Sequence, residues 1–285
     1  MKWLQAIQQQ FSQHKYAINA KQLGDDAELA WSNLGYWDDT TSSYPDACRQ
    51  LADQLAQAVH LTSTDRLLDL GCGQGASLVH WQQHYHVQHI EAVELQSSCV
   101  IQIQKYLPQL AAIHQQSFLN LKQIQLKSDF DVVLCIDAAY HSNLNSFLDS
   151  VNPVLNSKGR LGFHYLIWSE KWLNLNSLQK QKYEWLLKAA DVNLNHLMTE
   201  SRMRHTLQRY DFAEIEIRDL SKGVLQGFSN YFHTLQQLPQ QSIGLDAFKI
   251  RMTAKLCAKL YADGWVKYVQ ISAEKIISTD ILNIF

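Results

Sequence analysis

A glycine-rich turn that begins with a carboxylate is the stretch of this sequence with the clearest chemical potential. The segment LLDLGCGQGAS covers residues 67–77, and in it an apolar run ends at Asp69. The spacing of Gly71, Gly73 and Ala76 matches the fingerprint G-x-G-x-x-G/A, which joins a strand to a helix in nucleotide-binding sheets. Glycine tolerates positive φ and lets a ligand approach the backbone closely. The segment therefore predicts a loop that binds a nucleotide or a nucleoside.

The charge of Asp69 discriminates between the ligands that such a loop can take. A pyrophosphate on the loop would lie near this carboxylate, and two like charges about 4 Å apart repel by about 4 kcal/mol at an effective dielectric constant of about 20. S-adenosylmethionine has no phosphate and carries an ammonium and a sulfonium, while its own carboxylate can bind the amides of the following helix. We therefore expect S-adenosylmethionine as the cofactor. A nicotinamide-dependent oxidoreductase is the alternative, because the fingerprint also fits a dinucleotide.

Two further apolar runs end in an acid, at Glu94 and at Asp137. Ligands of open parallel sheets bind beyond the carboxyl ends of the strands, so these acids should lie beside the glycine loop. Glu94 follows the loop by about 20 residues, where a carboxylate binds the hydroxyls of a ribose. His141 stands shortly after Asp137, and an imidazole with a pKa near 6.5 suits a general base. We expect His141 and its neighbour Tyr140 at the reacting end of the site; the alternative is that His141 only shapes the pocket.

The pattern of apolar residues predicts the elements that position these groups. Continuous apolar runs alternate with helical patterns, which is typical of a parallel sheet covered by helices on both faces. The expected strands cover residues 66–70, 89–95, 110–115, 130–137, 159–168, 213–220 and 264–275. Helices are expected within 1–30, at 45–59, 74–85, 97–107 and 143–155, and over much of 169–210 and 222–261. The fold class is thus a doubly wound α/β sheet.

The domain organisation follows from the same pattern. No linker rich in Pro, Gly or Ser divides the chain. We expect residues 1–60 to form a helical arm that covers the cofactor, and residues 61–285 to form the cofactor-binding core. Aromatic and methionine side chains are frequent after the fifth strand, and they predict a helical substrate lid at about 168–210. The alternative is that these side chains pack against the sheet.

Composition narrows the classes of partner. The net charge is −2 and the sequence pI about 6.6, which gives no electrostatic reason to expect a surface that binds nucleic acid. No apolar window is long enough for a membrane span. The five cysteines form no C-x-x-C pair, so neither a disulfide framework nor a zinc site is indicated, and we expect a cytoplasmic protein. The histidines in HWQQHYHVQH lack the acid of a zincin motif, so no metal is expected. A small molecule is the expected partner, and the sequence leaves monomer and homodimer open.

Several stretches, in order, resemble class I S-adenosylmethionine-dependent methyltransferases. The glycine loop resembles their motif I, AVEL resembles the strand with the ribose-binding acid, and FDVVLCIDAAYH and PVLNSKGRLGF resemble the fourth-strand motif and the turn before the fifth strand. NLGYW at 33–37 and the C-terminal DGWVKYVQISAEK resemble the small-molecule branch, which includes sterol, tocopherol, coclaurine and natural-product methyltransferases. The resemblance covers about residues 33–275. It implies a seven-stranded, mostly parallel sheet in the order 3-2-1-4-5-7-6 with a helical lid insertion.

The resemblance also implies roles for individual residues. The methionine end of the cofactor would contact the loop, the ribose Glu94, and the adenine the residues after each of the next two strands. Asp137 would lie near the sulfonium, and two aromatic residues of the arm would close over the cofactor. The implied cofactor-binding residues are Asp69, Gly71, Cys72, Gly73, Glu94, Leu95, Gln96, Ser117, Phe118, Asp137, Tyr36 and Trp37.

The implied activity is methyl transfer to an oxygen or nitrogen atom of a small, partly apolar metabolite, with S-adenosylhomocysteine as the product. Two features depart from the family pattern. QQSF at 115–118 has no acid for the adenine amine, and His164 and Tyr165 stand where related O-methyltransferases often place an aspartate. These departures keep a non-catalytic, regulatory S-adenosylmethionine-binding protein as the alternative.

Overall fold

The computed structural model describes residues 19–127, 129–237 and 244–276, and these contain one seven-stranded sheet. Its order is β3-β2-β1-β4-β5-β7-β6, which is the order that the family resemblance implies. Neighbouring strands from β3 to β5 are parallel, and β7 runs antiparallel to both of its neighbours. The strands are β1 (Arg66–Leu70), β2 (His89–Glu94), β3 (Ala112–Gln115), β4 (Phe130–Cys135), β5 (Leu155–Trp168), β6 (Phe212–Asp219) and β7 (Val266–Lys275).

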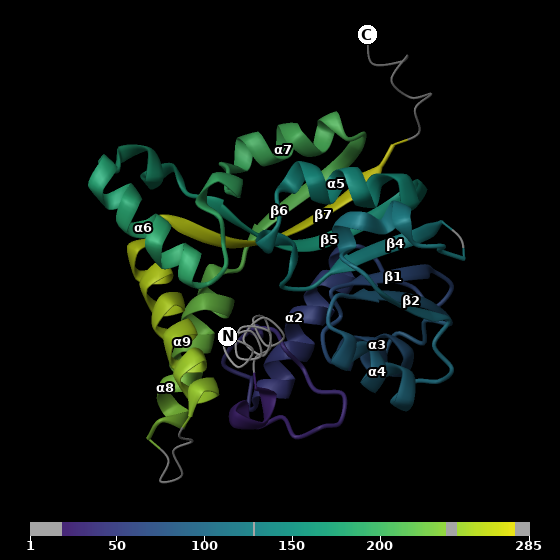
Figure 1. Ribbon diagram of the computed structural model, residues 1–285. Coiled ribbons are helices and arrows are strands. Elements are labelled where there is room, and N and C mark those ends of the chain that lie inside the picture. The colour runs from purple at the N-terminus through teal and green to yellow at the C-terminus, as the bar shows by residue number, and fades with distance from the viewer. Residues whose placement is uncertain (1–18, 128, 238–243, 277–285) are drawn as a thin grey trace, which may run out of the picture.

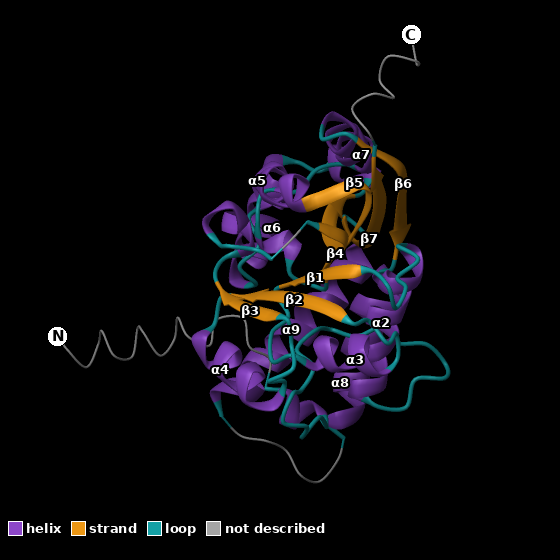
Figure 2. Cartoon of the chain, turned by 90° about the vertical axis from the view of Figure 1, so that its right-hand side faces the viewer, coloured by secondary structure: helices purple, strands orange, loops and turns teal. Residues whose placement is uncertain are grey.

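Helices cover both faces of this sheet (Figures 1 and 2). One face carries α2 (Tyr44–Ala58), α3 (Ala76–Gln83) and α4 (Ser97–Tyr106), and the other carries α5 (Leu144–Val151) and α7 (Glu200–Arg209). The start of α2 follows local rules, because the Ser43 hydroxyl accepts from the Asp46 amide and Pro45 occupies the first turn.

The core consists of two layers separated by the sheet. Successive strand residues point to opposite faces, so Leu67 packs with the α2 and α3 layer and Leu68 with the α5 and α7 layer. Both leucines are fully buried. Strands buried on both faces explain the continuous apolar runs from which they were predicted.

Three further helices, α6 (Ser177–Ala189), α8 (Gly227–Leu235) and α9 (Leu245–Asp263), lie beside this core. Only part of the expected lid is separate from the sheet, because α7 packs along β6 and buries Met203. Trp172 is also buried, with its ring stacked on Trp168 at 3.6 Å between centroids. Packing therefore explains much of the aromatic stretch. No helix in the described ranges has the length and hydropathy that crossing a bilayer requires.

The arm before α2 is mostly extended. Of the helices expected within residues 1–30, positions 1–18 lie outside the described residues, and the rest contains only a 3-10 turn at Ala20–Leu23. This turn ends at Gly24, which has a φ of 89°. The buried Asp25 carboxylate then accepts from the amides of Ala27 and Trp31, which stabilises a bend instead of a helix.

A close approach of α2 to β5 yields a prediction. A side chain on Gly162 would meet Val59 at 2.8 Å and Leu134 at 2.9 Å. We expect Gly162→Val to lower the free energy of unfolding by about 1–3 kcal/mol through overpacking, measured by urea denaturation. Ala213→Val on the edge strand β6 is the control and should change it by less than about 0.5 kcal/mol. Equal effects of the two substitutions would contradict the close packing.

Candidate functional site

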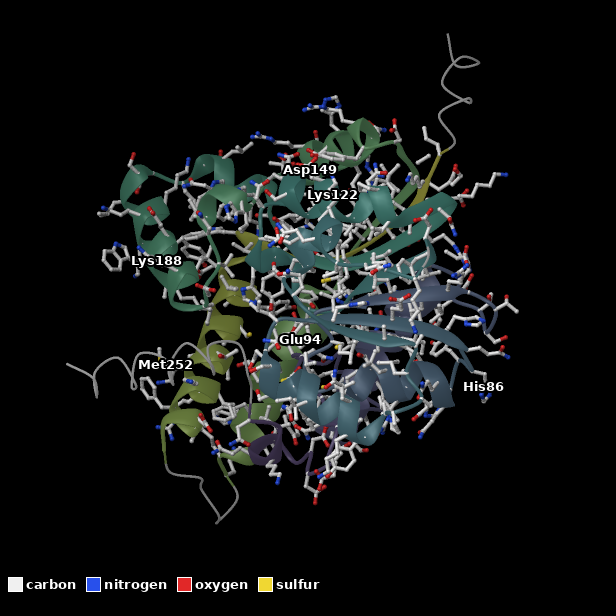
Figure 3. The ribbon with its side chains drawn as sticks, turned by 45° about the vertical axis from the view of Figure 1, so that its right-hand side comes forward. His86, Glu94, Lys122, Asp149, Lys188 and Met252 are labelled. Carbon is white, nitrogen blue, oxygen red and sulfur yellow. The ribbon has the colours of Figure 1, made fainter. Side chains whose placement is uncertain are left out.

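A cavity of about 250 Å³ opens at the carboxyl ends of β1, β2 and β4. Figure 3 shows Glu94, one of the residues that line it, near the middle of the molecule. Most residues predicted from the sequence do line this cavity. They are Asp69, Gly71, Cys72, Gly73, Glu94, Leu95, Gln96, Ser117, Phe118, Asp137 and His141.

The glycine loop after β1 has the backbone that its sequence predicts. Gly71, Gly73 and Gly75 have φ values of 68°, 56° and 93°, which disfavour any residue with a side chain. A Cβ on Gly73 would collide with the Ser32 hydroxyl, and one on Gly75 would lie 2.7 Å from Ile103. The loop therefore lies tightly between the arm and α4, with its backbone turned toward the cavity.

Glu94 connects the ends of β1 and β2. Its carboxylate accepts from the Gly73 amide at 2.9 Å and from the Gln96 amide at 2.8 Å. The residue is only 6% exposed, and burial raises the pKa of its carboxyl while the backbone hydrogen bonds lower it. Each carboxylate oxygen can accept more than one hydrogen bond, so the same group can also bind two ribose hydroxyls.

Asp69 is buried, although its position before the glycine loop predicts a carboxylate at the mouth of that loop. It is 1% exposed, and the Trp81 indole donates to its Oδ2 at 2.8 Å. Burial raises the pKa of this carboxyl to about 6, against hydrogen bonds from Ser77 and Trp81 that lower it. The carboxylate is thus positioned by α3 and still contributes to the cavity wall, where its charge favours a cation.

Asp137 connects three parts of the chain. Its Oδ2 accepts from the Leu34 amide of the arm and its Oδ1 from the Tyr268 hydroxyl of β7, both at 2.9 Å. The Tyr140 hydroxyl also donates a hydrogen bond to this carboxyl. Burial raises the pKa of the Asp137 carboxyl to about 6. Asp137 has a φ of 53°, a conformation that is uncommon outside glycine. Its hydrogen bonds therefore fasten the arm and β7 to the end of β4.

His141 takes its orientation from a backbone carbonyl. Its Nδ1 lies 3.2 Å from the carbonyl oxygen of Asp191, in the loop after α6. A carbonyl can only accept, so Nδ1 carries the proton and Nε2 is the basic nitrogen of the ring. Asp191 has a φ of 58°, a left-handed conformation that is uncommon outside glycine.

His164 is not a partner of His141. It is fully buried in β5, and its Nδ1 accepts from the Asp137 amide at 3.3 Å. Burial lowers the pKa of His164 to about 3, so this imidazole is neutral. His164 therefore has a structural role at the end of β4, and the Asp191 carbonyl lies within hydrogen-bond distance of Nδ1 of His141.

Three predicted residues do not line the cavity. Tyr36 packs against Gly223 and Trp37 stacks on Tyr231 of α8 at 4.1 Å, so both attach the arm to the helices after β6. Tyr140 contacts the Asp137 carboxyl and the His141 ring.

The arm residues that do line the cavity are Ala30, Trp31, Ser32 and Asn33. Sequence reasoning missed these four. The motif NLGYW, which begins at Asn33, did indicate that the arm contacts the cofactor. Its aromatic residues Tyr36 and Trp37 were predicted to make that contact, whereas Asn33 and the residues before it line the cavity.

Ser117 and His80, whose roles the sequence does not decide, both have hydrogen-bond partners nearby. The Ser117 hydroxyl accepts from the Leu119 amide and caps the turn Phe118–Gln123, so it begins that turn while lining the cavity. His80 lies 2.7 Å from the Asp53 carboxylate, which also accepts from Tyr85. This part-buried pair fastens α3 to α2 and gives one histidine of HWQQHYHVQH a structural role.

Comparison with known proteins agrees with this geometry. The family model "Mycolic acid cyclopropane synthetase" matches residues 12–278. Erythromycin 3''-O-methyltransferase from Saccharopolyspora erythraea is 37% identical over 73 residues, which are 26% of this chain and 24% of that relative. (+)-O-methylkolavelool synthase from Herpetosiphon aurantiacus is 24% identical over 275 residues, which cover 89% of this chain and 90% of that relative.

Among solved structures, geranyl diphosphate C-methyltransferase from Streptomyces coelicolor A3(2), in complex with Mg2+, geranyl diphosphate and S-adenosyl-L-homocysteine, has a TM-score of 0.68. It is 16% identical, with 94% of this chain and 97% of that chain covered. The expected resemblance to small-molecule S-adenosylmethionine-dependent methyltransferases is thus confirmed, and with it the cofactor class of the family.

The hydrogen bonds of Asp137 predict a link between the arm and cofactor affinity. Asp137→Asn cannot accept from both Leu34 and Tyr268, so the arm loosens and its cavity-lining residues with it. We expect the Kd of S-adenosylhomocysteine, measured by calorimetry, to rise about tenfold. Asp131→Asn is the matched control, because Asp131 bonds Arg66 and Asn156 at the opposite end of β4. The same rise in both variants would contradict this role.

The raised pKa of Asp69 predicts a pH dependence. A carboxyl with a pKa of about 6 is protonated at pH 5, and the ammonium of S-adenosylmethionine needs the ionised form. Binding then releases a proton below about pH 6, so affinity should rise by up to tenfold per unit as the pH increases to that value and then level off. Calorimetry between about pH 5 and 7.5 measures this. Asp69→Asn should flatten the profile, and an unchanged profile would refute the assignment.

Proposed function

The chain belongs to the mycolic acid cyclopropane synthetase family, and from this premise we propose that it transfers a methyl group from S-adenosylmethionine to an oxygen or nitrogen atom of a small, partly apolar metabolite. The single observation that carries the proposal is His141 in the cavity wall with its Nδ1 on the Asp191 carbonyl. An imidazole oriented in this way is a general base, which a hydroxyl or protonated amine requires when it becomes the nucleophile.

The names of the relatives support the oxygen acceptor. Both curated relatives described above are named for an O-methyl transfer or an O-methyl product. The C-methyltransferase among the structural neighbours shares only the fold with this chain at 16% identity. The histidine and the curated relatives therefore favour a heteroatom acceptor, and a hydroxyl first.

The residues around the cavity fit the cofactor. Glu94 would bind the ribose hydroxyls, the amides of the glycine loop the methionine carboxylate, and Asp69 the ammonium. Leu95, Gln96 and Phe118 would lie against the adenine. The cofactor supplies an electrophilic methyl group on a positively charged sulfur.

The chain's own contribution is alignment and proton transfer. A hydroxyl beside His141 would form the new carbon–oxygen bond while the carbon–sulfur bond breaks, and its proton would move to Nε2 of His141. The electron pair of the broken bond stays on sulfur, which becomes the thioether of S-adenosylhomocysteine. Holding the acceptor in line removes much of the barrier, because positioning converts an encounter in solution into a reaction between neighbours.

The surroundings of His141 also indicate the acceptor's polarity. Trp31, Ile136 and Leu119 supply apolar wall around the cavity. The acidic balance of the chain offers no counter-charge to a nucleic acid. A small molecule that presents a hydroxyl on an apolar skeleton fits these walls.

Transfer of a radiolabelled methyl group tests the activity. Purified protein with methyl-labelled S-adenosylmethionine and an organic-solvent extract of cells should produce a labelled product that partitions into the solvent. Release of the label as methyl iodide in hot hydriodic acid identifies an ether and hence an oxygen acceptor, because an N-methyl group needs harsher conditions and a C-methyl group is not cleaved. Tight cofactor binding without any labelled product would instead support the regulatory alternative.

His141→Ala tests the base. We expect kcat to fall by about 10²–10⁴-fold at saturating acceptor, while the Kd of S-adenosylhomocysteine changes less than about threefold. The fall should be smallest at high pH, where the acceptor ionises without help. His86→Ala is the control and should leave kcat unchanged, because His86 is exposed, does not line the cavity, and lies at the edge of the molecule away from Glu94 in Figure 3. Full turnover in the His141 variant would remove the histidine from the mechanism.

A further inference from the structure

The outer side of α6 carries large apolar side chains that the fold leaves exposed. Leu178 is 76% and Trp185 73% exposed, and Leu173 just before the helix is 64% exposed. Leu178, Lys182 and Trp185 follow the i, i+4, i+7 spacing of one helix stripe. The opposite stripe holds Tyr183 and Leu187, which are buried. This helix therefore has two apolar sides, and only one of them contacts the protein.

The neighbouring helix α9 repeats the pattern. Phe248 is 58% and Met252 47% exposed, and Lys255 and Lys259 continue the same stripe at steps of three or four residues. Lys259 lies 5.7 Å over the Tyr183 ring of α6. The two helices therefore adjoin through the inner, buried side of α6, and we call their exposed stripes together the α6–α9 face.

Figure 3 shows the labelled Lys188 and Met252 along one edge of the molecule, away from His86. The α6–α9 face thus lies on one side of the protein, and its residues are Leu173, Leu178, Lys182, Trp185, Lys188, Phe248, Met252, Lys255 and Lys259.

The charge of this face opposes that of the whole protein. Residues 169–190 contain four lysines against two acids, and α9 contains three lysines and an arginine against two acids, whereas the chain as a whole has a net charge of −2. Of the nearby acids, Asp263 forms an ion pair with Lys259 and accepts from Tyr183. On α6, Lys182 and Lys188 are exposed on either side of the stripe of Leu178 and Trp185. Cations thus border the exposed apolar side chains.

We propose that the α6–α9 face docks the protein on an anionic lipid surface. Tryptophan prefers the boundary between headgroups and acyl chains, and leucine, phenylalanine and methionine insert beneath it. Lysine can bury its methylene stem there while its ammonium reaches the phosphates. The exposed apolar residues are spread along two helices with lysines between them, a pattern that suits a fluid surface better than one compact pocket on a partner protein.

Docking through this face would also orient the cavity. The loop that follows α6 contains Asp191, whose carbonyl orients His141. An acceptor dissolved in the lipid would thus meet the protein at α6, and the loop after this helix connects the docking face with His141. The docking itself does not depend on methyl transfer, because its measurement needs neither cofactor nor acceptor.

Vesicle sedimentation with the full chain tests the proposal. The probes are vesicles of phosphatidylcholine alone and vesicles with about 30 mol% phosphatidylglycerol. We expect binding to the anionic vesicles to exceed binding to the neutral ones at least tenfold. Raising the salt from about 50 to about 300 mM should weaken it, because screening acts on exposed charges. Equal binding to both vesicles, or none to the anionic ones, would overturn the proposal.

Surface variants locate the contact. Leu178→Ala with Trp185→Ala should reduce vesicle binding at least tenfold, and Lys182→Glu with Lys188→Glu should reduce it by at least about fivefold per lysine. Ile101→Ala and Lys122→Glu are matched controls, since Ile101 is 65% exposed on α4 and Lys122 is exposed elsewhere. These controls should bind as the parent does. Thermal melting checks that each variant is folded, and parent-like binding of the α6 variants would refute this face.

Discussion

The site depends on one buried carboxylate. Asp137 accepts a hydrogen bond from the arm through Leu34 and another from β7 through Tyr268. Burial disfavours its ionised form, and the donors around it compensate for part of that cost. The result is a junction at which the end of β4, the arm before α2 and the antiparallel strand β7 meet. The arm residues beside the cavity keep their place because this junction fixes the backbone that follows them.

The strands and the cofactor loop could be read from the sequence because their signals are local. Apolar runs such as FDVVLCID predict strands buried on both faces, and the three glycines predict positive φ. Other features depend on distant packing. Whether Trp37 or Trp31 faces the cavity depends on α8, which provides Tyr231 as a stacking partner. Helical periodicity likewise cannot separate α7, which belongs to the core, from α6, which has an outer apolar side. The orientation of His141 has no sequence signal, because every residue has a carbonyl.

The chemistry of the family varies while the cavity end of the sheet stays similar. Relatives and neighbours of this chain are named for products methylated at oxygen and at carbon. The proposed cofactor contacts, at Glu94 and the glycine loop, would serve any of these reactions, because they would not touch the acceptor. The acceptor would instead meet groups such as the His141 imidazole after β4 and the apolar side chains of Ile136 and Leu119.

The contact between Asp137 and Tyr268 has a consequence for how the molecule is made. Ribosomes release the arm first and β7 late, since Leu34 and Tyr268 lie near opposite ends of the described residues. At about 5–20 residues per second, the arm waits roughly 10–50 s for the hydroxyl that completes its anchor. A nascent chain that lacks β7 can already form the bond between Leu34 and Asp137 but not the one from Tyr268, so the junction is completed only when the last strand joins the sheet.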